Sequence, residues 1–273
     1  MGIKRSLKDW APQWVLRRVK GWLGKSMRFS GHYDSWSVAA RESTGYDAAV
    51  ILERVAASTR KVVAGEAHYE RDSLLFHEPA YPFEILSVLL REAALQGGAL
   101  EVLDFGGSLG STYRQCRPFL EGVSRVRWRV IEQPEFARLG QFEFTTQELD
   151  FAEAVGVGHT SVGCGVVLLS SVLQYVEQPH RVLDNLILTG RRFVVIDRTP
   201  LSNATEDRLC IQHVPMSVYP ASYPCWILSR QRLLDHFGEG WRALGAFHSA
   251  EGAYRTTDRL DFEFGGMIFE REG

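Results

Sequence analysis

The stretch L-E-V-L-D-F-G-G-S-L-G-S-T-Y, residues 100–113, decides how the rest of the chain is interpreted. Its first half is a short apolar run that ends in an acid, Asp104, and its second half is broken by glycines before helix-forming sequence resumes. This order predicts a strand, a tight turn and the start of a helix. Glycine is needed where the backbone bends sharply and a ligand approaches closely, because a Cβ would collide there. The N-terminus of the following helix offers unpaired N–H groups to that ligand.

Several ligand classes use a glycine-rich turn between a strand and a helix. The dinucleotide pattern G-x-G-x-x-G, started at Gly106, would need glycine at Ser108 and Ser111, so it fits poorly. A phosphate-binding loop ends in G-K-[ST], and this stretch contains no lysine. The acid-x-G-x-G-x-G turn of S-adenosylmethionine (SAM) methyltransferases fits better, since two of its three glycines are present and serine is a small replacement for the other. The residues expected to bind the cofactor here are Asp104, Gly106, Gly107, Ser108 and Gly110.

A second apolar-alternating run, residues 126–131, ends in Glu132 about 20 residues beyond the glycine turn. Nucleotide-binding folds place at this spacing the carboxylate that accepts hydrogen bonds from ribose hydroxyls. We therefore expect Glu132 and the adjacent Gln133 to contact the cofactor. The alternative is a solvated acid at the end of a strand.

Two further apolar runs, residues 165–169 and 193–196, are typical of strands buried on both faces of a parallel sheet. The carboxyl ends of such strands face the ligand crevice, so the polar residues that follow are candidates for the site. After the first run, the alternative is that Ser170 and Ser171 cap a helix. After the second, the alternative is that Asp197 and Arg198 pair with each other. The candidates are Ser170 and Ser171 for the cofactor, Gln174, Tyr175 and Arg198 for the acceptor, and Asp197 for catalysis.

Several of these motifs together resemble a group of bacterial methyltransferases. The resemblance is carried by D-F-G-G-S-L-G-S-T-Y, V-I-E-Q-P, L-L-S-S-V-L-Q-Y-V-E-Q-P and V-V-I-D-R-T-P-L, with G-H-Y-D-S-W, S-T-G-Y-D and Y-P-C-W-I-L-S, and it covers the chain from about residue 29 onward. It implies an α/β, Rossmann-like class I methyltransferase fold and SAM as cofactor. The expected sheet is mostly parallel and seven-stranded, with an antiparallel C-terminal hairpin. Members of the group are associated with cell-surface polysaccharide and secondary products.

The bulk composition limits the classes of protein to which the chain could belong. A chain of 273 residues with 45% hydrophobic content can bury a full core, and its net charge of −2 gives no general case for nucleic-acid binding. The four cysteines form no C-x-x-C pair, so neither a zinc site nor a disulfide framework is expected. No apolar run reaches the roughly 20 residues needed to cross a bilayer. We expect a cytoplasmic protein.

Residues 1–25 carry seven basic side chains against one acid, Asp9, and their apolar residues fall near one face of a helix. Such a helix could lie at an anionic membrane surface, which would place the protein at the inner membrane face. The alternative is a helix packed on the catalytic domain with a solvated basic face. We expect residues 1–75 to form a helical extension or lid, and residues 76–273 to form the SAM-binding domain. Within the lid, Tyr33 and Trp36 are candidates to line an acceptor pocket.

The remaining expectations concern elements around the crevice. A helix is expected over residues 82–94. The third strand and the turn after it are expected within residues 142–151, where Gln147, Glu148 or Asp150 would touch the adenine. The proline- and aromatic-rich segment 219–226 is expected to be a loop over the strand ends, with Tyr223 facing the acceptor. Helix 230–237 and strands 241–248 and 261–270 would close the fold.

Methyl transfer from a sulfonium is an in-line displacement, so alignment and exclusion of water dominate catalysis. A hydroxyl acceptor would also need a general base, for which His32 and His213 are the leading histidines, ahead of His77 and His180. No metal is expected. Two other classes stay open: an inactive Rossmann-like binding protein, which Ser108 in the glycine turn would permit, and a dinucleotide-dependent enzyme.

Overall fold

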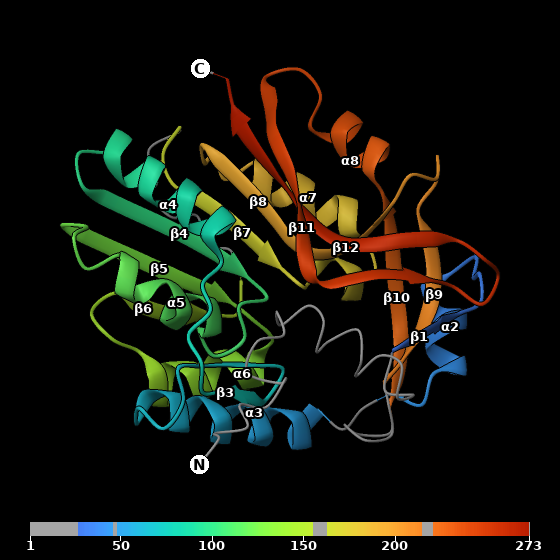
Figure 1. The fold of residues 1–273 in the computed structure, drawn as a ribbon, viewed down its shortest axis with the longest axis horizontal. Coiled ribbons are helices and arrows are strands. Elements are labelled where there is room, and N and C mark those ends of the chain that lie inside the picture. The colour runs from blue at the N-terminus through green and yellow to red at the C-terminus, as the bar shows by residue number, and fades with distance from the viewer. Residues whose placement is uncertain (1–26, 46–47, 155–162, 215–220, 273) are drawn as a thin grey trace, which may run out of the picture.

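The computed structural model describes residues 27–45, 48–154, 163–214 and 221–272. Its main sheet has ten strands, and seven of them lie in the order β6-β5-β4-β7-β8-β12-β11 (Figure 1). The first five are parallel to one another, and β12 is antiparallel to both of its neighbours. The expected mostly parallel sheet with an antiparallel C-terminal hairpin is therefore confirmed. The strands are β4 (Ala99–Phe105), β5 (Arg125–Ile131), β6 (Leu149–Ala152), β7 (Val166–Ser170), β8 (Phe193–Ser202), β11 (Trp241–Arg255) and β12 (Asp261–Arg271).

Each central strand alternates its side chains between two hydrophobic cores, one on either face of the sheet. In β7, Val166 and Leu168 pack into one core, while Val167 and Leu169 pack into the other. Because both faces are covered, this strand is apolar at almost every position. Helices α4 and α5 lie on the first face, and α7 and α8 lie on the second (Figure 1). They are α4 (Phe83–Leu95), α5 (Ser111–Cys116), α7 (Pro179–Ile187) and α8 (Arg230–Phe237).

The strand expected within residues 142–151 begins later than the sequence suggested. The segment after helix α6 (Pro134–Leu139) continues as a π-helical turn, Gly140–Phe144, and strand β6 starts only at Leu149. Phenylalanine side chains can pack into a core from a helix as well as from a strand, so a phenylalanine-rich stretch does not distinguish the two. Here Phe144 lies in the helical turn and is buried. Gln147 consequently precedes the strand.

The proline- and aromatic-rich segment expected to be a loop contains a strand, so that expectation was wrong for residues 222–226. Strand β10 (Ser222–Ser229) pairs with β9 (Arg208–His213), which pairs with β1 (Arg28–Ser30). These three strands extend the sheet beyond β8, and α2 (Trp36–Glu42) lies at that end (Figure 1). Residues 219–220 of the segment lie outside the described residues.

The N-terminal part of the described chain supplies further elements beside the sheet. Helices α2 and α3 (Ala48–Val63) match the helical character expected there. Strands β2 (Tyr69–Arg71) and β3 (Leu74–Phe76) form a separate two-stranded hairpin that sequence patterning did not reveal. Short 3-10 turns cover Arg117–Phe119 and Leu173–Tyr175. No helix among the described residues is long and apolar enough to span a membrane.

Helix α8 begins where the sequence predicted, because Ser229 caps it. The Ser229 hydroxyl accepts a hydrogen bond from the Arg232 backbone N–H at 3.3 Å. Replacing an N-cap serine by alanine costs about 1 kcal/mol. We expect Ser229→Ala to lower the free energy of unfolding by about that amount in a urea titration. Ser87→Ala, inside α4, is the matched control and should be neutral or slightly stabilising; an unchanged stability of Ser229→Ala would contradict the capping role.

Candidate active site

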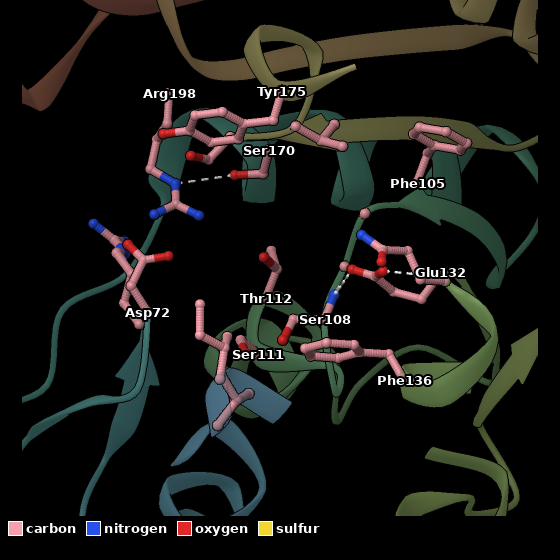
Figure 2. A pocket seen from close by; sticks show the side chains of 18 of the residues that line it. Asp72, Phe105, Ser108, Ser111, Thr112, Glu132, Phe136, Ser170, Tyr175 and Arg198 are labelled. Carbon is pink, nitrogen blue, oxygen red and sulfur yellow. Dashed lines mark hydrogen bonds between the residues drawn. The ribbon is translucent and has the colours of Figure 1, made fainter. Parts of the chain in front are cut away.

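A cavity of about 760 Å³ opens at the carboxyl ends of β4, β5, β7 and β8. Helices α2 and α3, the tip of the β2–β3 hairpin and strand β10 contribute further residues to its walls. Figure 2 shows Glu132 and Phe136 at one end of this cavity, and Arg198 and Asp72 at the other. The two ends differ in chemistry, because the first is built from backbone amides and one acid and the second from a guanidinium and carboxylates.

The glycine turn after β4 lines the first end and requires its glycines for steric reasons. Gly106 has φ of +74°, and a Cβ there would lie 2.4 Å from Val172. A Cβ on Gly107 would lie 2.4 Å from Oδ2 of Asp104. Ser108, at the position of the missing glycine, also adopts a left-handed conformation, with φ of 55°. The turn therefore keeps the expected shape although serine stands in for glycine.

Glu132 follows β5 and lies against this turn, so the two predicted cofactor motifs meet. Its carboxylate accepts hydrogen bonds from the backbone N–H of Ser108 at 3.1 Å and of Gln133 at 2.8 Å (Figure 2). Burial raises the pKa of Glu132, and these two hydrogen bonds oppose the rise. Two amide donors leave further lone pairs on the carboxylate, which can accept from hydroxyl groups of a ligand.

Asp104 lies beneath the glycine turn and does not line the cavity. Its side chain is fully buried and accepts a hydrogen bond from Trp128 Nε1 at 2.9 Å. The other carboxyl oxygen has no hydrogen-bond partner within the described chain. Burial raises the pKa of Asp104 to about 7, a rise that Trp128 opposes and the charge of Glu132 reinforces.

The raised pKa of Asp104 predicts a specific dependence of stability on pH. At pH values between the ordinary pKa of an aspartate and about 7, Asp104 is protonated in the folded state and ionised in the unfolded state. Asp104 therefore stabilises the fold at low pH, and this contribution is lost as the pH rises toward 7. Between pH 5 and pH 8 we expect the stability of the wild type to fall relative to Asp104→Asn by roughly 2–3 kcal/mol. Urea titrations of both proteins across this range measure the difference. A difference that is constant with pH would contradict the assignment.

The second end of the cavity is built around a buried carboxylate and a buried guanidinium. Ser170 donates to Asp197 at 2.6 Å and accepts from Nε of Arg198 at 3.2 Å. Burial raises the pKa of Asp197, against the opposing effects of Arg198 and Ser170. Burial alone would lower the pKa of Arg198, but the surrounding carboxylates, with Asp72 the strongest, outweigh it and raise the pKa.

The structure brings most of the predicted site residues together in this one cavity. The predicted residues that line it are Trp36, Gly106, Gly107, Ser108, Glu132, Gln133, Ser170, Ser171, Tyr175, Asp197, Arg198 and Tyr223. Gln174 supports this wall from behind: it is fully buried and donates to Ser171 and to the backbone carbonyl of Arg198. Gly110 is the left-handed N-cap of α5, below the lining of the cavity.

Both leading histidines lie outside the lining of the cavity. His32 is exposed, and His213 shares a hydrogen bond of 2.7 Å with Ser30 between β9 and β1. Tyr33 also does not line it and instead donates to Glu42 at 2.8 Å. Gln147 is exposed before β6, at the strand end remote from the cavity, whereas Glu153 after this strand does line it.

The remaining histidines of the sequence prediction are bonded elsewhere. His77 contacts the backbone carbonyl of Glu66, and His180 pairs with Asp207 at 2.8 Å and with His236 at 3.3 Å. Among the described residues, no group of three or more metal-binding side chains is suited to hold an ion. The charged side chains that line the cavity are acids and arginines, as far as the structure describes the chain.

Sequence patterning missed several residues that line the cavity. Glu70, Arg71 and Asp72 come from the β2–β3 hairpin, and Ser111 and Phe136 come from the first turns of α5 and α6. Buried Glu70 accepts a short hydrogen bond from Ser111, which ties the hairpin to the turn after β4. The sequence signal for the hairpin was the polar pair Asp72 and Ser73 between two short groups of residues that form the strands. This signal is too short to identify a turn that contains no glycine.

Comparisons with known proteins find similarity in structure alone. No family model matches the chain, and a search of curated proteins returns no match. A 1,6-didemethyltoxoflavin-N1-methyltransferase from Burkholderia thailandensis, solved with S-adenosylhomocysteine (SAH) and 1,6-didemethyltoxoflavin, is 15% identical over 85% of this chain and 95% of its own, with a TM-score of 0.42. The N-terminal domain of EvdMO1, solved with SAH and D-fucose, is 15% identical over 84% and 98%, with a TM-score of 0.47.

A third solved structure, the N-methyltransferase NodS from Bradyrhizobium japonicum WM9 with SAH, is 14% identical over 81% of this chain and 99% of its own, with a TM-score of 0.41. These likenesses are distant, and no ligand or reaction is carried from them to this chain.

Proposed function

We propose that this chain is a SAM-dependent methyltransferase that transfers a methyl group to an oxygen or nitrogen of a small-molecule or glycan acceptor. One observation carries the proposal. The glycine turn after β4 and the carboxylate after β5 are joined by the hydrogen bond from Ser108 to Glu132, at one end of a cavity above the carboxyl ends of a parallel sheet.

The residues at this end fit the proposed cofactor. Glycine at 106 and 107 avoids collisions with Val172 and Asp104, and a glycine turn lets the backbone approach a ligand closely. Glu132 offers oxygen acceptors suited to ribose hydroxyls. Ile131 and Phe136 add an apolar surface suited to a purine ring. SAM, when bound, supplies an electrophilic methyl group on a sulfonium.

The other end of the cavity would hold the acceptor in line with that methyl group. Ser170, Asp197 and Arg198 form a preorganised polar wall, and Trp36 and Tyr223 provide aromatic surface against which an acceptor can pack. Holding two reactants in the reactive geometry and excluding water are the main contributions that an enzyme makes to such a displacement. We include residues 1–75 in the proposal as a lid and residues 76–273 as the SAM-binding domain.

We also propose where in the cell and in which kind of biosynthesis this enzyme acts. The sequence resemblance favours a bacterial cytoplasmic enzyme that acts in cell-surface polysaccharide or secondary-product synthesis. The basic segment 1–25, which would supply contact with the inner membrane face, lies outside the described residues. Nothing in the charge balance favours a nucleic-acid partner.

The test is incubation of the purified protein with SAM and a library of hydroxylated and amine-containing metabolites and sugars, with SAH formation and product mass measured together. Methyl transfer that depends on one acceptor would support the proposal. Binding of NADH, detected by its fluorescence, would favour the dinucleotide alternative. Binding of SAM without transfer to any acceptor would favour an inactive binding protein.

A further inference from the structure

The tip of the β2–β3 hairpin holds two residues in the left-handed backbone conformation. Asp72 and Ser73 connect the paired residues Arg71 and Leu74, with φ of 51° and 64°. Two-residue hairpin turns with positive φ at both positions favour glycine, asparagine and aspartate, so Asp72 suits its position but Ser73 does not. Such strain persists only where the surroundings hold it, and it concentrates at functional sites.

The surroundings do hold the turn in place. Ser58 donates to the backbone carbonyl of Ser73 at 2.7 Å, and the Ser73 backbone N–H donates to Glu70 at 3.3 Å. Glu70 is in turn bonded to Ser111 after β4. The hairpin tip is thus fixed to the strand ends, and it carries the Asp72 side chain into the cavity (Figure 2).

Asp72 differs from every other carboxylate that lines the cavity. Glu70 and Asp197 accept hydrogen bonds from serines, Glu132 accepts from two backbone amides, and Glu153 pairs with Arg138 at 3.5 Å. Within the described part of the chain, the carboxylate of Asp72 accepts no hydrogen bond and forms no ion pair. A ligand can therefore use both of its oxygens.

Arg198 complements Asp72 from the other side. Its Nε donates to Ser170, but its two terminal nitrogens donate to no acceptor among the described residues. Asp72 is close enough to stabilise the charged guanidinium, yet the two groups form no direct ion pair. Figure 2 shows both side chains pointing into the cavity, so a ligand can place one polar group against each.

The chemistry of this pair selects a class of acceptor. A carboxylate accepts a hydrogen bond from a hydroxyl, and a guanidinium donates to a neighbouring oxygen, so the pair suits adjacent hydroxyls of a sugar-like ring. Tyr175 lies near Arg198 (Figure 2), and the ring of Tyr223 lies 5.3 Å from the ring of Tyr175. Trp36 also lines the cavity, and the aromatic surface of these residues suits the apolar face of such a ring.

We infer that Asp72 is the general base of a sugar O-methyltransferase reaction and that Arg198 orients the acceptor by its neighbouring oxygen. This inference rests on the proposed function. As the acceptor oxygen forms its bond to the methyl carbon, the carbon–sulfur bond of the sulfonium breaks and its electron pair stays on sulfur. The hydroxyl proton passes to the carboxylate of Asp72, so charge and atoms balance with SAM as the only co-reactant.

The experiment uses the full chain loaded with SAH or with methyl-deuterated SAM, and a panel of methyl hexosides, methyl deoxyhexosides and amino-sugar glycosides as probes. Saturation-transfer NMR on the SAH-loaded protein measures sugar binding, and mass spectrometry measures transfer of the labelled methyl group. We expect at least one probe to bind and to be methylated. Asp72→Asn should bind that probe and SAH nearly as the wild type does, yet transfer the methyl group about 100-fold more slowly.

The variants separate catalysis from folding and from binding. Asparagine tolerates positive φ, so Asp72→Asn should keep the hairpin, and Asp72→Glu should recover part of the rate. Arg198→Lys should weaken probe binding more than turnover. Asp235→Asn, the same charge change on the exposed face of α8, is the control and should leave both unchanged.

Three results would overturn the inference: no probe binds the SAH-loaded wild type, Asp72→Asn transfers at the wild-type rate, or Asp72→Asn loses probe binding instead of turnover. Failure of the proposed function would look different, because the wild type would then not bind SAH at all.

Discussion

Gly107→Ala is expected to destabilise the fold by roughly 2–3 kcal/mol and to weaken SAH binding at least about tenfold. The new Cβ would lie 2.4 Å from Oδ2 and 2.5 Å from Cγ of Asp104. Asp104 cannot turn aside, because it is fully buried and bonded to Trp128. The backbone of the glycine turn must therefore shift, which displaces the Ser108 amide that contacts Glu132.

Thermal unfolding and calorimetric titration with SAH measure both effects. At this chain length, 1 kcal/mol corresponds to about 2–4 °C in Tm, so a fall of roughly 4–12 °C is expected. Gly122→Ala is the matched control, because nothing lies within 4 Å of the added Cβ and Gly122 is exposed. Wild-type stability and affinity in Gly107→Ala would show that the turn is not the rigid cradle described above.

Glu132→Ala is expected to weaken SAM and SAH binding about 100-fold. A hydrogen bond to a charged group contributes about 1.5–3 kcal/mol, and the two ribose hydroxyls of the proposed cofactor would both use this carboxylate. The substitution also frees the Ser108 and Gln133 amides that Glu132 holds in place. Stability should change less than affinity, because Glu132 lies at the cavity surface.

Glu135→Ala provides the control for Glu132. Glu135 is exposed on the first turn of α6, pairs with Arg138 at 2.7 Å and does not line the cavity. In calorimetric titrations with SAH, Glu135→Ala should bind with near wild-type affinity, whereas Glu132→Ala should not. Equal affinities in the two variants would remove Glu132 from the cofactor site.

The parts of the fold that were predictable from sequence are those with strong local signals. Strands such as β7 are continuous apolar runs, and helix α8 has a serine cap, so each had a clear signal in the sequence. Glu132 was also found, because the chain length between successive parallel strands fixes where the acid after β5 meets the turn after β4.

The parts that were missed depend on contacts distant in sequence. Strand β10 contains Pro224 and Trp226, which suggest a loop when read locally, but pairing with β9 decides its conformation. Asp72 reaches the cavity only because Ser58, Glu70 and Ser111 fix its hairpin, and no local pattern marks that arrangement.

The histidine candidates illustrate the same limit. His32 and His213 were selected for their chemistry, and both occur in segments that were expected to form lids. Strand pairing instead directs His213 toward Ser30, and His32 faces solvent. Residue type alone could not determine which polar side chains would face the cavity.

Isothermal titration of the wild-type protein with SAH tests most directly the claim that the glycine turn and Glu132 form a SAM site. We predict one site per chain with a dissociation constant in the micromolar range, together with competition by SAM. The absence of heat at high protein concentration, with no change in Tm when SAH is added, would contradict the claim.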